Sequence, residues 1–165
     1  RGFLLKQTNA LPLKITASNT KTEYASSATL FREYATWLNI DLCFQGFEEE
    51  LTHLSEMYAS PSGVIFLSKE EEIFTGCVAV RKKDADVAEL KRMYIKQEFR
   101  KAGLGSALLE KALAAAKKMG YKKIRLDTLS HMTNAINLYT KAGFYAIEPY
   151  YFNPEKNALF FEKLL

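Results

Sequence analysis

The chain has 165 residues, 48% of them hydrophobic and 25% charged, with a formal net charge of +4 at pH 7. This size and composition indicate one globular domain, residues 1–165, with a core of ordinary proportions. No apolar run approaches the ~18 residues that a membrane-spanning helix needs, and the apolar stretch at residues 1–5 is too short for a signal peptide. We therefore expect a cytoplasmic protein that does not bind membranes.

The cysteines and the charged residues narrow the functional classes further. Cys43 and Cys77 lie far apart without C-x-x-C spacing, which argues against a zinc site and a disulfide framework and predicts two buried free thiols. With two histidines in the chain, we expect no metal. Acidic residues are interspersed among the basic ones, so a nucleic-acid partner is not expected, although a modest positive field would suit a phosphorylated ligand.

The first third of the chain predicts a strand followed by two helices. Residues 11–17 have the pattern of a strand, and Thr20 with Glu23 forms a capping box that begins a helix. That helix places four large side chains on one face: Tyr24, Phe31, Tyr34 and Leu38. A second helix has apolar residues at the same spacing and ends before Pro61: Phe44, Phe47, Leu51, Leu54 and Tyr58.

The middle of the chain predicts three strands. Residues 63–67 and 73–81 form an antiparallel hairpin that turns through 68–72, and residues 87–96 form the next strand. This last strand loses strict alternation between Leu90 and Met93, as a β-bulge would produce. The remaining elements are expected to be a helix, a strand, a helix and two strands: 106–119, 123–129, 130–142, 146–150 and 158–164. Ser130 is a candidate cap for the second of these helices.

A glycine loop joins the 87–96 strand to the following helix. Residues 100–105 have the pattern R-x-x-G-x-G, and several free backbone N–H groups would converge at the first turn of the helix. Such a turn suits a pyrophosphate, although an ordinary strand-to-helix connection can have the same pattern. The loop lacks the Gly-Lys-Ser/Thr of nucleoside triphosphatases and the third glycine of the dinucleotide fingerprint, which disfavours both functions.

A second motif follows about thirty residues later. Residues 135–144 read A-I-N-L-Y-T-K-A-G-F and match the core of N-x-x-A-x-x-L-Y-x-x-x-G-F. Together, the two motifs resemble the GNAT superfamily of N-acetyltransferases, whose loop reads Q/R-x-x-G-x-G/A, and in particular an uncharacterised bacterial branch. The resemblance implies a mixed α/β fold, with a mostly antiparallel sheet of six to seven strands, about four helices and a β-bulge in the central strand. The leading Asn of the motif is Met132 here, so Asn134 is either its replacement or a polar residue near a helix start.

The resemblance implies an acetyl-CoA-dependent N-acetyltransferase, in which a primary amine attacks the thioester directly in a ternary complex. The coenzyme would bind to the bulged strand, the glycine loop and the last two helices: Met93, Tyr94, Ile95, Arg100, Lys101, Ala102, Gly103, Leu104, Gly105, Ser106, Asn134 and Tyr139. The alternatives are a non-catalytic acyl-CoA-binding or regulatory module and, from a third class, a basic nucleic-acid-binding domain.

Two residues are candidate catalytic groups through the same resemblance. Tyr139 is the Tyr of the second motif, where a phenol either protonates the leaving thiolate or packs the helix against the sheet. Glu89 matches the place of the general base in histone-type members, and partial burial would raise its pKa toward neutrality. The alternatives are an ion pair of Glu89 with Lys91, a base supplied by Glu48 or Glu49, or a water chain without a single base.

The resemblance places the acceptor site between the first two helices and the penultimate loop. Acidic and aromatic residues of these segments would suit a cationic amine, either a small molecule or a peptidyl amine: Phe44, Glu48, Glu49, Glu50, Tyr150 and Tyr151. A solvated acidic helix face beside aromatic core residues explains the same pattern. A homodimer through the C-terminal strands is compatible with the sequence.

Overall fold

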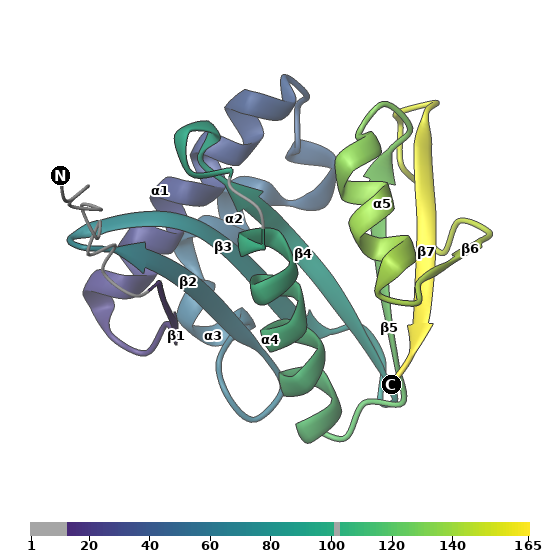
Figure 1. Ribbon diagram of the computed structural model, residues 1–165. Helices are drawn as coiled ribbons and strands as arrows, with labels where there is room; N and C mark the ends of the chain where they lie inside the picture. The colour runs from purple at the N-terminus through teal and green to yellow at the C-terminus, as the bar shows by residue number, and fades with distance from the viewer. Residues whose placement is uncertain (1–12, 101–102) are drawn as a thin grey trace, which may run out of the picture.

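The structure is a computed structural model and describes residues 13–100 and 103–165. Seven strands form one sheet in the order β1-β2-β3-β4-β5-β7-β6 (Figure 1). Their bounds are β1 Lys14–Ala17, β2 Val64–Glu70, β3 Ile73–Lys82, β4 Val87–Ile95, β5 Lys123–Leu129, β6 Tyr145–Ile147 and β7 Ala158–Leu164. Neighbouring strands are antiparallel except β4 and β5, which are parallel. The expected mixed, mostly antiparallel sheet is confirmed.

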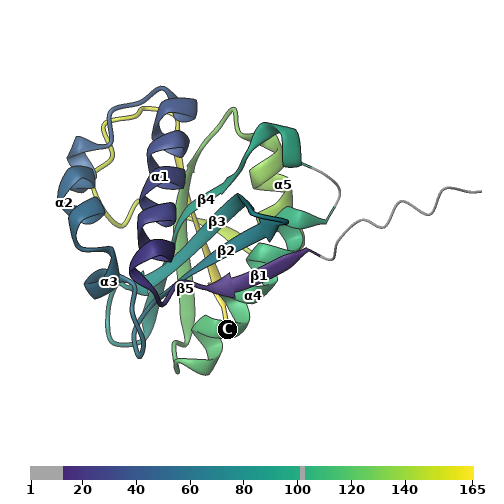
Figure 2. The ribbon, with the colours of Figure 1, turned by 90° about the vertical axis from the view of Figure 1, so that its left-hand side faces the viewer.

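Helices cover both faces of this sheet (Figure 2). One face carries α1 Lys21–Leu38, α2 Phe47–Thr52 and α3 Leu54–Met57, and the other carries α4 Leu104–Lys118 and α5 Thr133–Lys141. These five α-helices of the described residues are one more than expected. None of the helices in 13–100 and 103–165 combines the length and the apolar composition that crossing a membrane requires.

Each face of the sheet has its own hydrophobic core, because β3 and β4 are buried on both sides. Val78 and Val80 of β3 pack with α4 and α5, whereas Cys77 and Ala79 of the same strand pack with α1 to α3. Successive side chains of a strand point to opposite faces, so a continuous apolar run is what a doubly covered strand requires. The central strands are therefore fixed between two layers of helices.

The start of α1 confirms the capping box. Thr20 Oγ1 accepts a hydrogen bond from Glu23 N at 3.2 Å, and Glu23 Oε2 accepts one from Thr20 N at 3.0 Å. The single second helix was a wrong prediction, since this segment forms a 3-10 turn (Cys43–Gln45), then α2, then α3. The reason is local: Gly46 has a φ of +69°, and His53 has a φ of −126° with a ψ of 26°, so neither residue continues an α-helix.

Several other boundaries differ from the sequence prediction. The hairpin turn is shorter than the predicted 68–72, because β2 continues as far as Glu70 and β3 begins at Ile73. Glu71 in this turn has a φ of +54°. The helix expected from Ser130 begins only at Thr133, after Met132, and its start has no side-chain cap. The strand expected at 146–150 is Tyr145–Ile147.

Two further expectations are settled only in part. Cys77 is buried as expected, but Cys43 is exposed, so only one of the two thiols lies in the core. The first strand is described from β1 onward, and residues 11 and 12 of its expected range lie outside the described residues. Neither point alters the sheet order or the position of the motifs.

Candidate functional site

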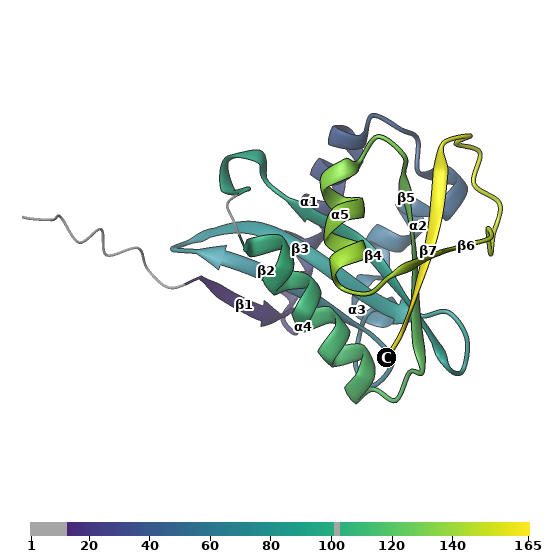
Figure 3. The same ribbon diagram turned by 45° about the vertical axis from the view of Figure 1, so that its right-hand side comes forward.

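The strands β4 and β5 meet at one end and separate toward the other (Figures 1 and 3). Their parallel pairing covers only Val87–Glu89 with Lys123–Arg125, although β4 continues to Ile95 and β5 to Leu129. Beyond this pairing, the edge of β4 that faces β5 has no strand partner within the described residues. Backbone N–H and C=O groups at such a split remain available to a ligand.

A β-bulge lies in β4 where the two strands separate. Cys77 pairs with Tyr94 and Ala79 pairs with Lys91. Between these two pairs the chain advances by two residues on β3 but by three residues on β4. The extra residue accompanies a left-handed conformation at Arg92, whose φ is +56°. The expected bulge in the central strand is confirmed, and it turns the end of β4 away from β5.

A cleft of about 400 Å³ opens at the split on the side of α4 and α5. The C-terminal end of α1, β4 beyond the bulge, the first turn of α4 and the start of α5 line it. Six of the residues expected at the coenzyme are in this lining: Met93, Tyr94, Ile95, Arg100, Gly105 and Asn134. The structure therefore brings both sequence motifs to one cleft, which we call the donor cleft.

The start of α4 forms one wall of the donor cleft. Gly103 precedes the helix with a φ of +96°, and no side chain of the described residues caps the first turn. A Cβ at Gly105 would lie 3.4 Å from Leu138 Cδ2 and 3.8 Å from Met93 Cε, so this glycine keeps the cleft open. The Leu104 side chain is buried and Ser106 is exposed outside the lining, while Lys101 and Ala102 lie outside the described residues.

Arg100 borders the cleft but is already engaged. Its guanidinium carbon lies 4.3 Å from the centroid of the Trp37 ring, and its Nε donates to Ile95 O at 2.8 Å. Stacking of this kind orients a guanidinium without neutralising its charge. Arg100 can therefore contribute positive potential at the cleft while its side chain holds α1 against β4.

Tyr139 lies in the core between α5 and the sheet. Its ring meets Phe144 edge to face with centroids 5.7 Å apart, and the residue is buried. Burial raises the pKa of Tyr139 well above its ordinary value, and the neighbouring Tyr34 and Asp127 raise it further. The phenol therefore keeps its proton throughout the physiological range, and Tyr139 is not among the residues that line the donor cleft.

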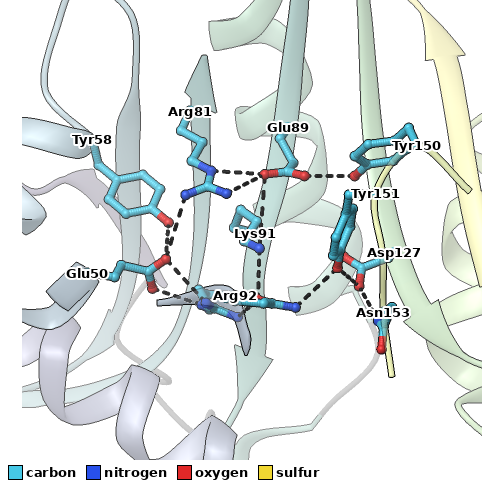
Figure 4. A network of polar contacts seen from close by, with 11 residues as sticks. Glu50, Tyr58, Arg81, Glu89, Lys91, Arg92, Asp127, Tyr150, Tyr151 and Asn153 are labelled. Atoms are coloured by element: carbon cyan, nitrogen blue, oxygen red, sulfur yellow. Dashed lines mark hydrogen bonds and ion pairs between the residues drawn. The ribbon is translucent and has the colours of Figure 1, made fainter. Parts of the chain in front are cut away.

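A buried polar network fills the other side of the split (Figure 4). Arg92 Nε and Nη2 donate to the two carboxylate oxygens of Glu50 at 2.9 and 3.2 Å, and Tyr58 donates to the same carboxylate at 3.0 Å. Arg81 lies between Glu50 and Glu89, with its Nη2 2.8 Å from Glu89 Oε1. Charges buried this deeply persist only when they are paired and hydrogen-bonded.

Glu89 does not have the near-neutral pKa that was expected of it. Its side chain is 2% exposed, and burial alone would raise its pKa. The charges of Lys91 and Arg81, together with a 2.8 Å hydrogen bond from the Tyr150 hydroxyl, outweigh burial and hold the pKa of Glu89 below its usual value. Glu89 is therefore an ionised, ion-paired carboxylate, and only its expected proximity to Lys91 is confirmed, at 4.0 Å.

A second, smaller cavity of about 40 Å³ lies beside this network, and we call it the acceptor cavity. Its lining includes these polar side chains: Gln45, Lys91, Arg92, Asp127 and Asn153. Leu38 and Met132 line both this cavity and the donor cleft, so the two spaces are adjacent.

The residues expected at the acceptor are only partly brought together. Tyr151 donates to Asp127 at the cavity wall, and Tyr150 donates to Glu89 behind it. Glu48 and Glu49 are exposed and do not line the cavity, and Glu48 forms an ion pair with Arg32 at 3.3 Å. Phe44 belongs to the 3-10 turn before α2.

Comparison with known proteins identifies the family to which this architecture belongs. The profile of the acetyltransferase (GNAT) family matches residues 31–144, which include the split, the glycine loop and α5. The chain belongs to the GNAT acetyltransferase family. It is therefore an acyltransferase, and the sequence resemblance is confirmed.

Individual GNAT proteins support the assignment. An uncharacterised N-acetyltransferase of Schizosaccharomyces pombe is 35% identical over 133 residues, covering 79% of this chain and 82% of its own. An acetyltransferase structure from Streptococcus agalactiae superposes with a TM-score of 0.76 at 21% identity, covering 93% of this chain and 98% of the other. The PaiA N-acetyltransferase of Thermoplasma acidophilum, solved in complex with coenzyme A, gives a TM-score of 0.73 at 19% identity, covering 94% and 100%. Similarity is thus not confined to bacteria, and the two structures establish the shared fold.

The sequence prediction missed most of the acceptor side of this GNAT site. Arg81, Lys91, Arg92 and Asp127 were not assigned, although the charged run of β4 lies in a strand that is otherwise apolar. A buried strand that carries three charges within four residues, Glu89 to Arg92, is the signal that could have found them. Among residues 13–100 and 103–165, no three His, Cys, Asp or Glu side chains converge as a metal site requires.

The buried network makes a stability prediction. Changing Glu50 to Gln removes the charge opposite Arg92, so we expect the free energy of unfolding to fall by about 3–5 kcal/mol. The exposed counterpart is Glu48→Gln, which breaks the surface pair with Arg32 and should cost about 0.5 kcal/mol or less. Urea denaturation of both variants measures the difference. Equal losses of unfolding free energy in the two variants would contradict the prediction that the buried Glu50–Arg92 pair stabilises the fold.

Proposed function

We propose that the chain is an acetyl-CoA-dependent N-acetyltransferase that transfers an acetyl group to a primary amine by direct attack in a ternary complex. The observation that carries the proposal is that the donor cleft and the acceptor cavity lie next to each other at the bulged end of β4. Two substrates that enter from opposite sides of the split would approach each other there. Such positioning supplies a large part of the rate in a bimolecular transfer.

Acetyl-CoA is the proposed donor. Its pyrophosphate would bind the uncapped first turn of α4 and the loop that includes Lys101 and Ala102, with Gly103 to Ser106 supplying N–H groups. Its pantetheine arm would pair with the free edge of β4 at Met93–Ile95, opposite Asn134. The coenzyme A in the Thermoplasma acidophilum protein of the same fold supports this choice of ligand.

The proposed reaction forms one bond and breaks one. The amine nitrogen attacks the thioester carbonyl, the carbon–sulfur bond breaks, and the amide and the free coenzyme thiol are the products. Backbone N–H groups around Met93 to Ile95 would polarise the carbonyl oxygen, and Tyr139 would give its proton to the departing thiolate. The phenolate then recovers a proton from solvent.

The proton that leaves the attacking ammonium goes to water in this proposal. Because its pKa is lowered, Glu89 is not the general base at neutral pH in this proposal. Its role is instead to orient the side chains of Arg81, Lys91 and Tyr150. The acidic limb of the pH profile should then follow the pKa of the acceptor amine. A change of acceptor to one of lower amine pKa should move that limb to lower pH.

Thiol release with acetyl-CoA across a broad panel of primary amines tests the proposed function. We expect release that depends on the amine and gives an acetylated product of matching mass. A protein that binds acetyl-CoA but releases no thiol with any amine would instead be the non-catalytic binding module. The cytoplasm remains the expected location.

A further inference from the structure

The acceptor cavity has a cationic wall. Lys91 and Arg92 line it from β4, and Asp127 is the one carboxylate in its lining. Lys91 Nζ and Arg92 Nη1 both donate to the same neutral oxygen, Gln45 Oε1, each at 2.9 Å. Two buried cations therefore converge on a single uncharged acceptor at the edge of the cavity.

Lys91 is the less neutralised of these two cations. Its side chain is 4% exposed, and the carboxylate oxygen recorded within reach of its ammonium is Glu89 Oε1, at 4.0 Å. That oxygen is already held by Arg81 at 2.8 Å. Arg92, by contrast, has Glu50 as a close partner on two of its nitrogens. A buried ammonium in this position is stabilised by an anion that enters the cavity.

Asp127 and the small volume of the cavity restrict which anion can bind there. Asp127 Oδ2 accepts hydrogen bonds from both Tyr151 and Asn153, and no hydrogen bond from the described residues reaches its Oδ1. A volume of about 40 Å³ holds roughly three water-sized groups, which suits a carboxylate and excludes a bulky anion. Asp127 is available in the same lining to pair with an ammonium beside that carboxylate.

We infer that the acceptor carries a carboxylate next to its reacting amine, as an amino acid does, and that Lys91 and Arg92 bind this carboxylate. The inference rests on the proposed function, because it names the acceptor class of the same site. It replaces the expectation of an acidic pocket for a purely cationic amine. Of the three glutamates that this expectation required, Glu48 and Glu49 are exposed, Glu50 is buried and paired with Arg92, and none lies in the cavity lining.

Binding of the carboxylate should weaken as the pH rises, because Lys91 loses its positive charge. Burial, and next the charge of Arg92, lower the pKa of Lys91 to about 8. Arg81 acts in the same direction, whereas Glu89 and Asp127 act against it. Lys91 is therefore protonated below about pH 8 and loses its charge above it, so affinity for a carboxylate should fall as the pH rises through that value.

Equilibrium binding of a matched pair of probes, N-acetylglycine and N-acetylglycinamide, tests the inference without turnover. With coenzyme A present at pH 7, we expect the carboxylate to bind about 10- to 100-fold more tightly than the amide, the range for a hydrogen bond to a charged group. Lys91→Met and Lys91→Gln should reduce this difference, since only Arg92 remains to bind the carboxylate. Lys69→Met, which changes a half-buried lysine on β2, should keep it.

The outcomes separate this inference from the proposed function. Equal binding of the two probes by the unchanged protein, including no binding of either, overturns the inference, as does a preference that is undiminished in both Lys91 variants. In the thiol-release assay, acetylation of decarboxylated amines at the same kcat/KM as their parent amino acids overturns the inference and leaves the acetyltransferase function standing. No thiol release with any amine, despite a preserved carboxylate preference, refutes the function instead.

Discussion

Replacing Tyr139 with Phe is expected to lower kcat by about 10²- to 10⁴-fold, the usual contribution of a positioned acid. The change removes one hydroxyl and keeps the ring that packs on Phe144, so the affinity for acetyl-CoA should stay within about two-fold. Because the pKa of Tyr139 is raised, the loss should be similar at every pH at which the protein is folded. Steady-state thiol release and direct coenzyme binding measure the two quantities.

The matched control for this variant is Tyr121→Phe. Tyr121 is also buried, and its hydroxyl donates to Ser62 O at 2.6 Å, away from the split. We expect it to lose about 1 kcal/mol of stability and to keep its kcat. Unchanged kcat in Tyr139→Phe, with the control behaving as expected, would mean that Tyr139 packs the helix and that water protonates the thiolate.

Replacing Gly105 with Val is expected to weaken acetyl-CoA binding by about 100-fold, a difference of about 2.7 kcal/mol in binding free energy. The Cβ itself fits, because its neighbours Leu138 and Ile95 would lie at 3.4 and 3.7 Å. The two methyl groups beyond it would extend into the donor cleft, where we propose that the coenzyme lies. The protein should remain folded, since the residue is near the start of α4 and its backbone is not in the left-handed region that disfavours a side chain.

Gly105→Ala provides the comparison for this prediction. Its single methyl group makes ordinary contacts, so the loss of affinity should be about 10-fold or less and the thermal stability should be kept. Isothermal titration with acetyl-CoA measures both variants. If Gly105→Val binds acetyl-CoA as tightly as the original protein, the coenzyme does not lie in this cleft.

The fold and the donor half of the site could be predicted because their signals are local in the sequence. The capping box at Thr20 and Glu23, the lost alternation in β4 and the glycine loop each span a few residues. The long second helix failed for an equally local reason. Its apolar spacing continues through Gly46 and His53, and periodicity alone does not reveal that the backbone at both residues leaves the helical region.

The acceptor half could not be predicted because its contacts join distant parts of the chain. Arg92 meets Glu50 across 42 positions, and Tyr150 reaches Glu89 across 61. Glu48, Glu49 and Glu50 are adjacent in sequence, yet only Glu50 points into the network. The pKa of Glu89 depends on both kinds of contact, since Lys91 lies two residues away on the same strand, whereas Arg81 approaches from another strand.

Hydrogen exchange of the backbone amides, measured with and without acetyl-CoA, tests the role of the split between β4 and β5 most directly. We expect slower exchange in peptides that contain residues 93–95 and 103–106, and no change in β1 or β2. That pattern would place the coenzyme along the free edge of β4 and at the start of α4. Protection confined to other segments, or no protection at saturating acetyl-CoA, would contradict the proposed donor site.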